Sequence, residues 1–181
     1  MTSNKSYYDP EGGKAMQKLI PGKYNAHITN VEVIEQKMIQ NYCANIYNIT
    51  VTIDKNVDNF GGREVKSSGV FHFLAPQDGD SFENNASGNN KYYNLLKACG
   101  IECPTETIAI NDSGDTREVY MLPDLAESIG SFDGKAVVAK VGETKPFTNS
   151  EGKTITPIKV VWFETWEGGV DRDLVDESIP F

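Results

Sequence analysis

Long apolar runs are missing from this chain of 181 residues. No stretch approaches the roughly 20 apolar residues that a membrane-spanning helix needs. The N-terminus has no positively charged start followed by an apolar segment, which is the pattern of a signal peptide. These absences argue against membrane insertion and secretion, so we expect a cytoplasmic protein with no membrane partner.

Cysteine is scarce, and its spacing does not suggest a metal site. The three cysteines are Cys43, Cys99 and Cys103. An odd number in a chain without a secretion signal indicates reduced thiols. Zinc takes four Cys or His ligands, but no two cysteines have the close spacing of a zinc knuckle, and His27 and His72 are scattered. We therefore expect buried or partly buried free thiols and no bound metal.

Recognisable catalytic motifs are also missing. The chain has no Walker loop, no nucleophile elbow and no HExxH helix. The short run Gly12-Gly13-Lys14 lacks the spacing of a phosphate-binding loop and follows no predicted strand. We expect no catalytic residues and no cofactor, and hence a protein that is not an enzyme.

Basic residues are outnumbered, with 17 Lys and Arg against 26 Asp and Glu and a net charge of −9. From Glu164 onward the chain carries six acids against Arg172 alone, or −5, which leaves −4 for the rest (−9 minus −5). The remaining bases gather on the predicted strands and their loops. An overall acidic protein of this kind can still present a locally basic groove.

What the sequence does contain is a series of short alternating segments typical of half-buried strands. In the first, from Gly22 to Glu35, the alternation changes phase at Thr29-Asn30, as a β-bulge would produce. A turn is expected from Met38 to Cys43. Further strands are predicted at Ala44–Asp54, Arg63–Leu74, Lys135–Lys145 and Thr154–Thr165.

The region between the third and fourth predicted strands, residues 75–134, differs in character. It begins with a polar stretch and then shows a helical pattern from Asn90 to Cys99, which Gly100 can end. A second short helix is predicted from Pro123 to Ile129, because proline is favoured in the first turn. We interpret the whole region as an acidic, helix-containing insertion.

The order of three strands, a helix-bearing insertion and two strands resembles the OB-fold. That fold is a five-stranded Greek-key barrel with a helix between strands three and four. The alternative is another small β-barrel or a sandwich with an inserted helical pair. We predict a mainly β chain with a flexible leader at 1–20, an OB-fold domain at 21–166 and a disordered acidic tail at 167–181.

The last residues of the chain form a short motif. Acids at Asp173, Asp176 and Glu177 lead into Ile179-Pro180-Phe181. This ending resembles the acidic C-terminal tip of bacterial single-stranded-DNA-binding proteins, which closes on Ile-Pro-Phe, although Ser178 stands where those tips usually have another acid. The resemblance implies docking to a DNA polymerase, a helicase or primase, or a nuclease. The divergent body favours a phage-encoded version.

The chemistry of this ending also suits docking. Proline restricts both its own φ and the preceding residue, so Ile179 and Pro180 lose little entropy on binding. Phe181 offers a ring beside a carboxylate, which an apolar pocket and a partner's Arg or Lys can capture. The alternative is a solvated acidic tail that only keeps the protein soluble.

An OB barrel binds single strands with aromatic side chains that stack on bases and with cations that meet phosphates. Tyr47, Phe71 and Phe73 share the phase of buried residues and are favoured as core, whereas Phe147 sits in a polar loop and is favoured for base stacking. The candidates for nucleic-acid contact are Lys37, Tyr42, Tyr47, Arg63, Lys66, Lys140, Lys145, Phe147, Lys153, Lys159 and Trp162.

These features predict a protein that binds single-stranded DNA without sequence choice during replication, recombination and repair, and whose tail recruits other proteins. We expect a monomer or a small homo-oligomer. The main alternative is an adaptor or inhibitor that binds no DNA and uses its Ile-Pro-Phe tip to occupy a host replication-protein pocket. A nuclease whose acids gather only in three dimensions is a more distant alternative.

Overall fold

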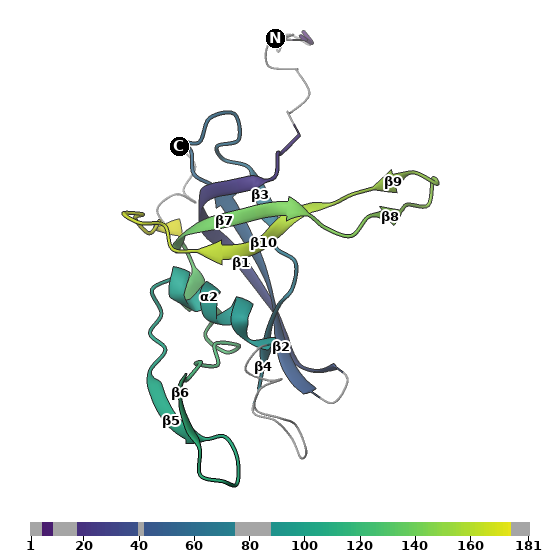
Figure 1. The fold of residues 1–181 in the computed structure, drawn as a ribbon. Helices are drawn as coiled ribbons and strands as arrows, with labels where there is room; N and C mark the ends of the chain where they lie inside the picture. Colours follow the sequence, from purple (N-terminus) through teal and green to yellow (C-terminus); the bar gives the residue numbers. More distant parts are fainter. Residues whose placement is uncertain (1–4, 9–17, 40–41, 75–87, 175–181) are drawn as a thin grey trace.

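The chain is mainly β. The computed structural model describes residues 5–8, 18–39, 42–74 and 88–174 (Figure 1). Its main sheet contains β1 (Gly22–Ile39), β2 (Tyr42–Ile53), β3 (Glu64–Lys66), β4 (Val70–Phe73), β7 (Ala136–Glu143) and β10 (Ile158–Glu164). The strand order is β10-β7-β1-β2-β3, with β4 also paired to β2, and every ladder in the sheet is antiparallel.

Two small hairpins and one α-helix complete the described elements. The first hairpin pairs β5 (Thr105–Ala109) with β6 (Thr116–Tyr120), and the second pairs β8 (Phe147–Thr148) with β9 (Thr154–Ile155). The helix α2 spans Asn90–Ala98, and the 3₁₀ helix η1 spans Ile129–Phe132. The two hairpins project from different parts of the body (Figure 1).

The long strand β1 shapes the sheet, since it pairs with β2 on one side and with β7 on the other. Its register with β2 shifts between Ile28 and Asn30, which confirms the predicted β-bulge, and again between Ile34 and Lys37. Bulges of this kind bend a strand and increase its twist. β1 can therefore bend between its first residues, Gly22–His27, which pair with β7, and the residues from Ala26 onward, which pair with β2.

The two ends of the sheet approach each other without a continuous ladder between them. An isolated parallel bridge joins Ser67, just after β3, to Val160 of β10. Beside it, the Ser68 N–H donates to the Val160 carbonyl over 3.1 Å. We call this contact between β3 and β10 the seam. The sheet formed by the described strands is not a closed barrel.

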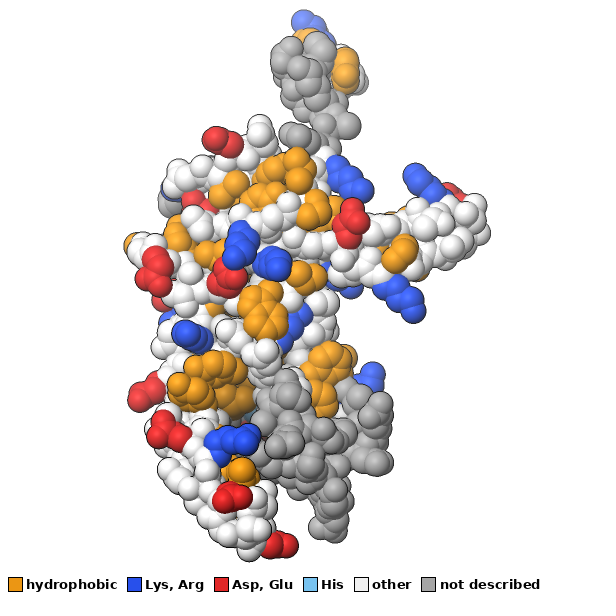
Figure 2. Space-filling view, in the orientation of Figure 1, with side chains coloured by type: hydrophobic (Ala, Val, Ile, Leu, Met, Phe, Trp, Pro, Cys, Tyr) orange, Lys and Arg blue, Asp and Glu red, His pale blue; other side chains and the backbone are white. Residues whose placement is uncertain are grey.

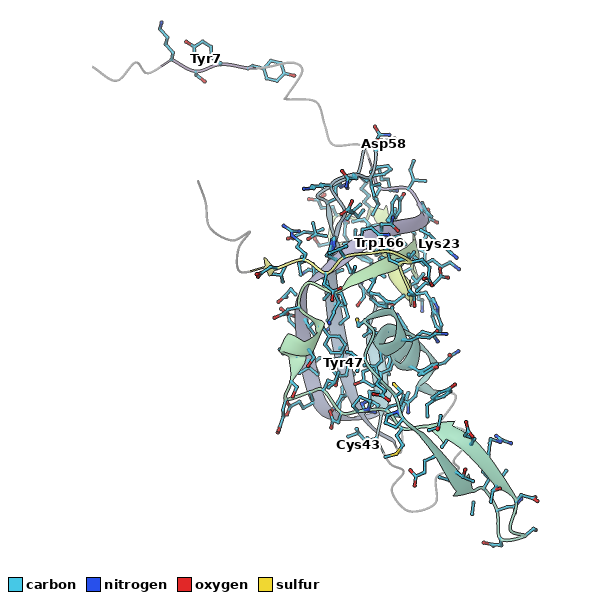
Figure 3. The ribbon with its side chains drawn as sticks, turned by 90° about the vertical axis from the view of Figure 1, so that its left-hand side faces the viewer. Tyr7, Lys23, Cys43, Tyr47, Asp58 and Trp166 are labelled. Carbon is cyan, nitrogen blue, oxygen red and sulfur yellow. The ribbon has the colours of Figure 1, made fainter. Side chains whose placement is uncertain are left out.

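The core lies between the curved sheet and α2. Tyr47, Ile49, Val51 and Ile53 are all fully or almost fully buried, as their alternation predicts. The Tyr47 ring stacks on that of Tyr92 from α2, with centroids 5.2 Å apart, and Figure 3 shows Tyr47 among the long strands beside the helix. Large aromatic rings carry much of the buried apolar area in such a core.

Several predicted boundaries were wrong. β1 continues to Ile39 and β2 begins at Tyr42, so the turn expected over Met38–Cys43 is much shorter. The third predicted strand is broken into β3 and β4, since the Ser67 hydroxyl, rather than a ladder residue, accepts the Ile49 N–H at 3.0 Å. The helix over Asn90–Cys99 is confirmed as α2, and Gly100 follows it with a φ of 69°.

The predicted helix over Pro123–Ile129 was wrong, because its polar groups bond elsewhere. Asp124 Oδ1 accepts from the Ala126 N–H and from the Asn45 side-chain amide, each over 3.0 Å. The Pro123 carbonyl accepts from the Tyr92 hydroxyl over 2.7 Å. These bonds hold a turn, and only Ile129–Phe132 coils into the 3₁₀ helix.

The first part of the predicted tail lies against the body. His27 Nε2 donates to the Val170 carbonyl over 2.9 Å, Asp171 Oδ1 accepts from the Ala136 N–H over 2.9 Å, and the Arg172 N–H donates to the Gly134 carbonyl over 2.7 Å. We call residues 166–172 the strap. Five of the docking candidates lie outside the described residues, namely Asp176, Glu177, Ile179, Pro180 and Phe181. Most of the polar stretch that opens the insertion also lies outside them.

None of the helices in the described part of the chain is both long and apolar enough to span a bilayer.

Candidate nucleic-acid interface

A polar groove of ≈ 240 Å³ lies on the solvent side of the sheet. The alternation of β2 explains its position, because Tyr47 and Ile49 point into the core while Asn48 and Thr50 point away from it. In the antiparallel ladders Asn48 lies opposite Glu32 of β1, and Thr50 lies opposite both Asn30 and Lys66. The groove is lined by Asn30, Glu32, Asn48, Ile49, Thr50, Lys66, Ser67 and Lys159.

The seam brings two of the predicted DNA-contacting lysines together. Lys66 ends β3 and Lys159 is the second residue of β10, and both line the groove. The Ser67–Val160 bridge places these strands side by side. Neither lysine makes a salt bridge with another described residue. Two cations thus flank a polar groove that also contains the carboxylate of Glu32, with which neither lysine forms a salt bridge.

Trp162 and Lys140 extend this surface along β10 and β7. They are partners in the ladder, and the adjacent pair Phe163–Ala139 is fully buried, so Trp162 and Lys140 face away from the core. A register shift between Val160 and Trp162 allows Lys159 and Trp162 to lie on the same outward face. Trp162 therefore lies on the outer face of the sheet, where it is half-buried.

The β8–β9 hairpin carries the predicted stacking residue. Phe147 is 51% exposed and pairs across the hairpin with Ile155, which is 36% exposed. Lys145 precedes Phe147 and Lys153 precedes β9, and both are exposed. Figure 2 shows basic side chains on this projecting arm and on the body beside it. An exposed ring between two cations has the composition of a base-stacking element.

The base of this hairpin is fixed next to the groove. The Thr144 N–H donates to the Pro157 carbonyl over 2.8 Å, and the Thr144 hydroxyl donates to the same oxygen over 3.1 Å. Lys159 follows two residues later, so the hairpin leaves the body at the end of β10 that lines the groove. At the tip, Asn149 Oδ1 accepts from the N–H groups of Glu151 and Lys153, each over 3.0 Å.

Other predicted contact residues lie elsewhere. Tyr47 is fully buried and cannot stack on a base from that position, because α2 covers its ring. Arg63 lies over the Phe60 ring at 5.9 Å, in the turn between β2 and β3, and does not line the groove. Lys37 is exposed near the end of β1. The backbone of Tyr42 begins β2, but its side chain is not among the described ones.

The uncharged side chains of the groove were not predicted from the sequence. Asn30 and Asn48 line the groove, and the alternation of buried neighbours on β2 could have indicated this. Phe71 and Phe73 were expected in the core, but Val70 and His72 occupy the buried phase of β4 instead. The two phenyl rings are half-buried and stack on each other, with centroids 6.0 Å apart, on the outer side of the strand.

Two side chains outside the groove, those of His72 and Lys91, have perturbed ionisation. Burial lowers the pKa of His72 to about 4, and the nearby Asp124 carboxylate only partly opposes this effect. Burial also lowers the pKa of the Lys91 ammonium, which donates to the Ser68 hydroxyl over 2.7 Å. Lys91 thus ties α2 to the seam, while the His72 side chain of β4 stacks on Tyr92 of α2.

No group of three or more His, Cys, Asp or Glu side chains within residues 5–8, 18–39, 42–74 and 88–174 could hold a metal ion. The cysteines in this part of the chain are free thiols, and burial raises the pKa of Cys99 to about 12. No protein-family model and no curated protein sequence matches the chain.

Proposed function

We propose that this protein binds single-stranded DNA and that its acidic tail recruits replication and repair proteins. The observation that carries the proposal is the juxtaposition of Lys66 and Lys159 on one polar groove, next to a hairpin that exposes Phe147 between two lysines. Cations that meet phosphates and rings that stack on bases are the two elements that binding to single strands requires.

The strand connections support an OB-like assignment. The described sheet has three consecutive antiparallel segments, β1, β2 and the pair β3 and β4, followed by α2 and then by β7 and β10. β7 returns to pair with β1, and the parallel seam links β3 to β10. An OB-fold has this order with its helix between strands three and four. The β8–β9 hairpin would then join the fourth and fifth strands of the OB-like order, β7 and β10.

In this proposal the strand runs over the seam. Phosphates meet Lys66 and Lys159, and a base stacks on Phe147. Further contacts come from Lys145 and Lys153 on the β8–β9 hairpin, and from Lys140 on β7 and Trp162 on β10. Stacking tolerates any base, because every base has a π-face. Binding of this kind covers exposed DNA during replication, recombination and repair.

The tail has a separate role in this proposal. The strap holds the chain against the body up to Arg172, and the acids and the Ile-Pro-Phe ending follow. Phe181 and its carboxylate would enter a pocket on a polymerase, helicase, primase or nuclease. When no DNA is bound, the acidic tail would lie over the lysines. DNA that enters the groove would then have to displace the tail, so the two would compete for the same cations.

A salt titration tests the DNA-binding part. A labelled dT oligonucleotide should bind more weakly as salt rises, with log K falling about 0.7 per phosphate contact and per unit of log salt. Replacing Lys66 and Lys159 together by Gln should reduce the slope by about 1.4, because two contacts are lost. The matched control replaces Lys97, exposed on α2, by Gln and should leave the slope unchanged.

A second titration tests the stacking residue. Phe147→Ala should weaken binding by about 1–3 kcal/mol, the range for loss of one base stack. The control is Tyr120→Ala, because Tyr120 is a similarly exposed aromatic residue, 55% exposed, on the other hairpin. Equal effects of the two substitutions would show that Phe147 has no special role. Absence of any oligonucleotide binding in dilute buffer would overturn the proposed function.

The net charge of −4 that remains for the chain before Glu164 (−9 minus −5) favours one other candidate, an adaptor that binds no DNA. Such a protein would use its Ile-Pro-Phe ending to occupy a docking pocket on a host replication protein. The same titration separates the two functions, because the adaptor would leave the oligonucleotide unbound at every salt concentration while still binding a protein partner through its tail.

A further inference from the structure

Lys91 is a partly buried cation in the first turn of α2. It makes no salt bridge with another described residue. Its Nζ donates to the Ser68 hydroxyl over 2.7 Å and to the Ser68 carbonyl over 3.4 Å. Burial lowers the pKa of this ammonium, because the charged form loses hydration in the folded chain. The two bonds to Ser68 have a charged donor, so they are stronger than bonds between neutral groups.

Ser68 extends this contact to β10. Its N–H and its hydroxyl both donate to the Val160 carbonyl, over 3.1 Å and 3.5 Å. Lys91, Ser68 and Val160 thus form a chain of hydrogen bonds from α2 through the seam to β10. The helix at the start of this chain is itself fixed, because Leu95 and Leu96 are fully buried in the core. Lys91 therefore anchors the seam to the core.

The seam sets the distance between Lys66 and Lys159. On one side, the Ser67 N–H donates to the Ile49 carbonyl over 2.7 Å, and the Ser67 hydroxyl accepts from the Ile49 N–H over 3.0 Å, so Lys66 stays with β2. Lys159 belongs to β10, and the ladder path from β2 to β10 otherwise runs through β1 and β7. Two like charges also repel each other. The bonds across the seam oppose this repulsion and keep both lysines on one groove.

We propose that Lys91 is a positioning residue for binding to single strands. It holds Ser68 against β10, and so keeps Lys66 and Lys159 close enough to meet neighbouring phosphates of one strand. Lys91 does not line the groove, and in this role its ammonium stays bonded to Ser68 and does not contact the strand. The proposal rests on the proposed function and deepens it, because it names a residue outside the groove on which the two lysines of the groove depend.

The test repeats the salt titration of a labelled dT oligonucleotide with two variants. Lys91→Met removes the ammonium and keeps an unbranched side chain, whereas Ser68→Ala removes one hydroxyl without a change in net charge. Each should weaken binding about five-fold at about 0.1 M salt, the counterion contribution of one lost phosphate contact. Each should also lower the salt slope by about 0.7. A lower slope for the charge-neutral Ser68→Ala is a result that a role in stability alone would not give.

The matched control is Lys97→Met, because Lys97 is exposed in the last turn of the same helix. It should leave affinity and slope unchanged. Lys91→Met is then introduced into the double variant Lys66→Gln, Lys159→Gln, where it should have no further effect, because the contacts that it positions are already lost. A further loss of about five-fold in that background would show that Lys91 meets a phosphate itself, and would overturn the positioning role.

Urea unfolding at the temperature of the titration separates effects on folding from effects on binding. If Lys91→Met does not fold, Ser68→Ala carries the test, since it removes a single hydroxyl. If the wild type binds and both folded variants keep its affinity and slope, the positioning role is refuted while the proposed function stands. If the wild type binds no oligonucleotide, the proposed function fails and the positioning role fails with it.

Discussion

Protonation of His72 should make the stability of this protein depend on pH. His72 lies on β4, is 5% exposed, and stacks on the Tyr92 ring with centroids 4.1 Å apart. Its Nδ1 is buried and has no hydrogen-bond partner among the residues that the structure describes. A charged imidazolium in this position would lose its hydration, so burial lowers the pKa to about 4.

The sign and size of the effect follow from linkage. The unfolded chain binds a proton at His72 near pH 6.5, whereas the folded chain binds it only near pH 4. Between these values the unfolded state holds more protons, so stability falls as the pH falls from about 6.5. The lost free energy of unfolding is about 2 kcal/mol at pH 5 and about 3 kcal/mol at pH 4.

The assay is urea unfolding of the wild type and of His72→Phe at pH 7, 5 and 4. Phenylalanine keeps a flat ring against Tyr92 but cannot take up a proton. Other groups that titrate in this range, the carboxylates in particular, contribute to both proteins and cancel in the difference. We expect the stability of His72→Phe relative to wild type to rise by about 2 kcal/mol from pH 7 to pH 5. Parallel pH profiles would refute the reasoning.

Three further predictions concern the strap, the core and the tail. Gly134→Ala should destabilise the protein more than Gly152→Ala does, as measured by urea unfolding. Both glycines have a positive φ, but only a side chain at Gly134 would meet the Arg172 carbonyl. Tyr47→Phe should leave oligonucleotide affinity unchanged in the dT titration, since the ring is buried. Deleting residues 173–181 should strengthen DNA binding at low salt and abolish capture of tail-dependent partners, and unchanged affinity would remove the idea of competition.

Local alternation predicted much of the sheet, because the burial of one strand face is encoded by neighbouring residues. The core phase of β2 and the bulge at Ile28–Asn30 could both be read this way. The end of α2 at Gly100 was predictable for a similar reason, since a left-handed residue there follows from local backbone chemistry. Features set within a few residues were therefore accessible from the sequence.

Features that depend on contacts between residues far apart in the chain could not be predicted from the sequence. The break between β3 and β4 depends on the Ser67 hydroxyl, which bonds to β2, and on Val160 across the seam. The turn that replaced the helix at Pro123 depends on Asn45 and Tyr92. None of these partners is near in sequence, so periodicity alone could not have revealed them.

The candidate site shows the same division. Phe147 was found because a ring in a polar loop is locally unusual, and it is exposed on its hairpin. The outward face of Trp162 was undecidable because a register shift in β10 sets it. The pairing of Lys66 with Lys159 across a groove depends on the seam, which joins strands at opposite ends of the sheet order.

The strap gives the acidic part of the chain a fixed starting point. Through the bonds of Val170, Asp171 and Arg172 to the body, the tail departs near His27 and Gly134 rather than directly from the end of β10. The ion pair of Asp171 with Lys135, at 3.3 Å, also neutralises one acid before the tail begins. The negative charges that compete with DNA are therefore the acids beyond residue 172. A truncation that also removed Asp171 would break its bonds to Ala136 and Lys135 and disturb the body. Such a truncation could not isolate the effect of the tail's charge.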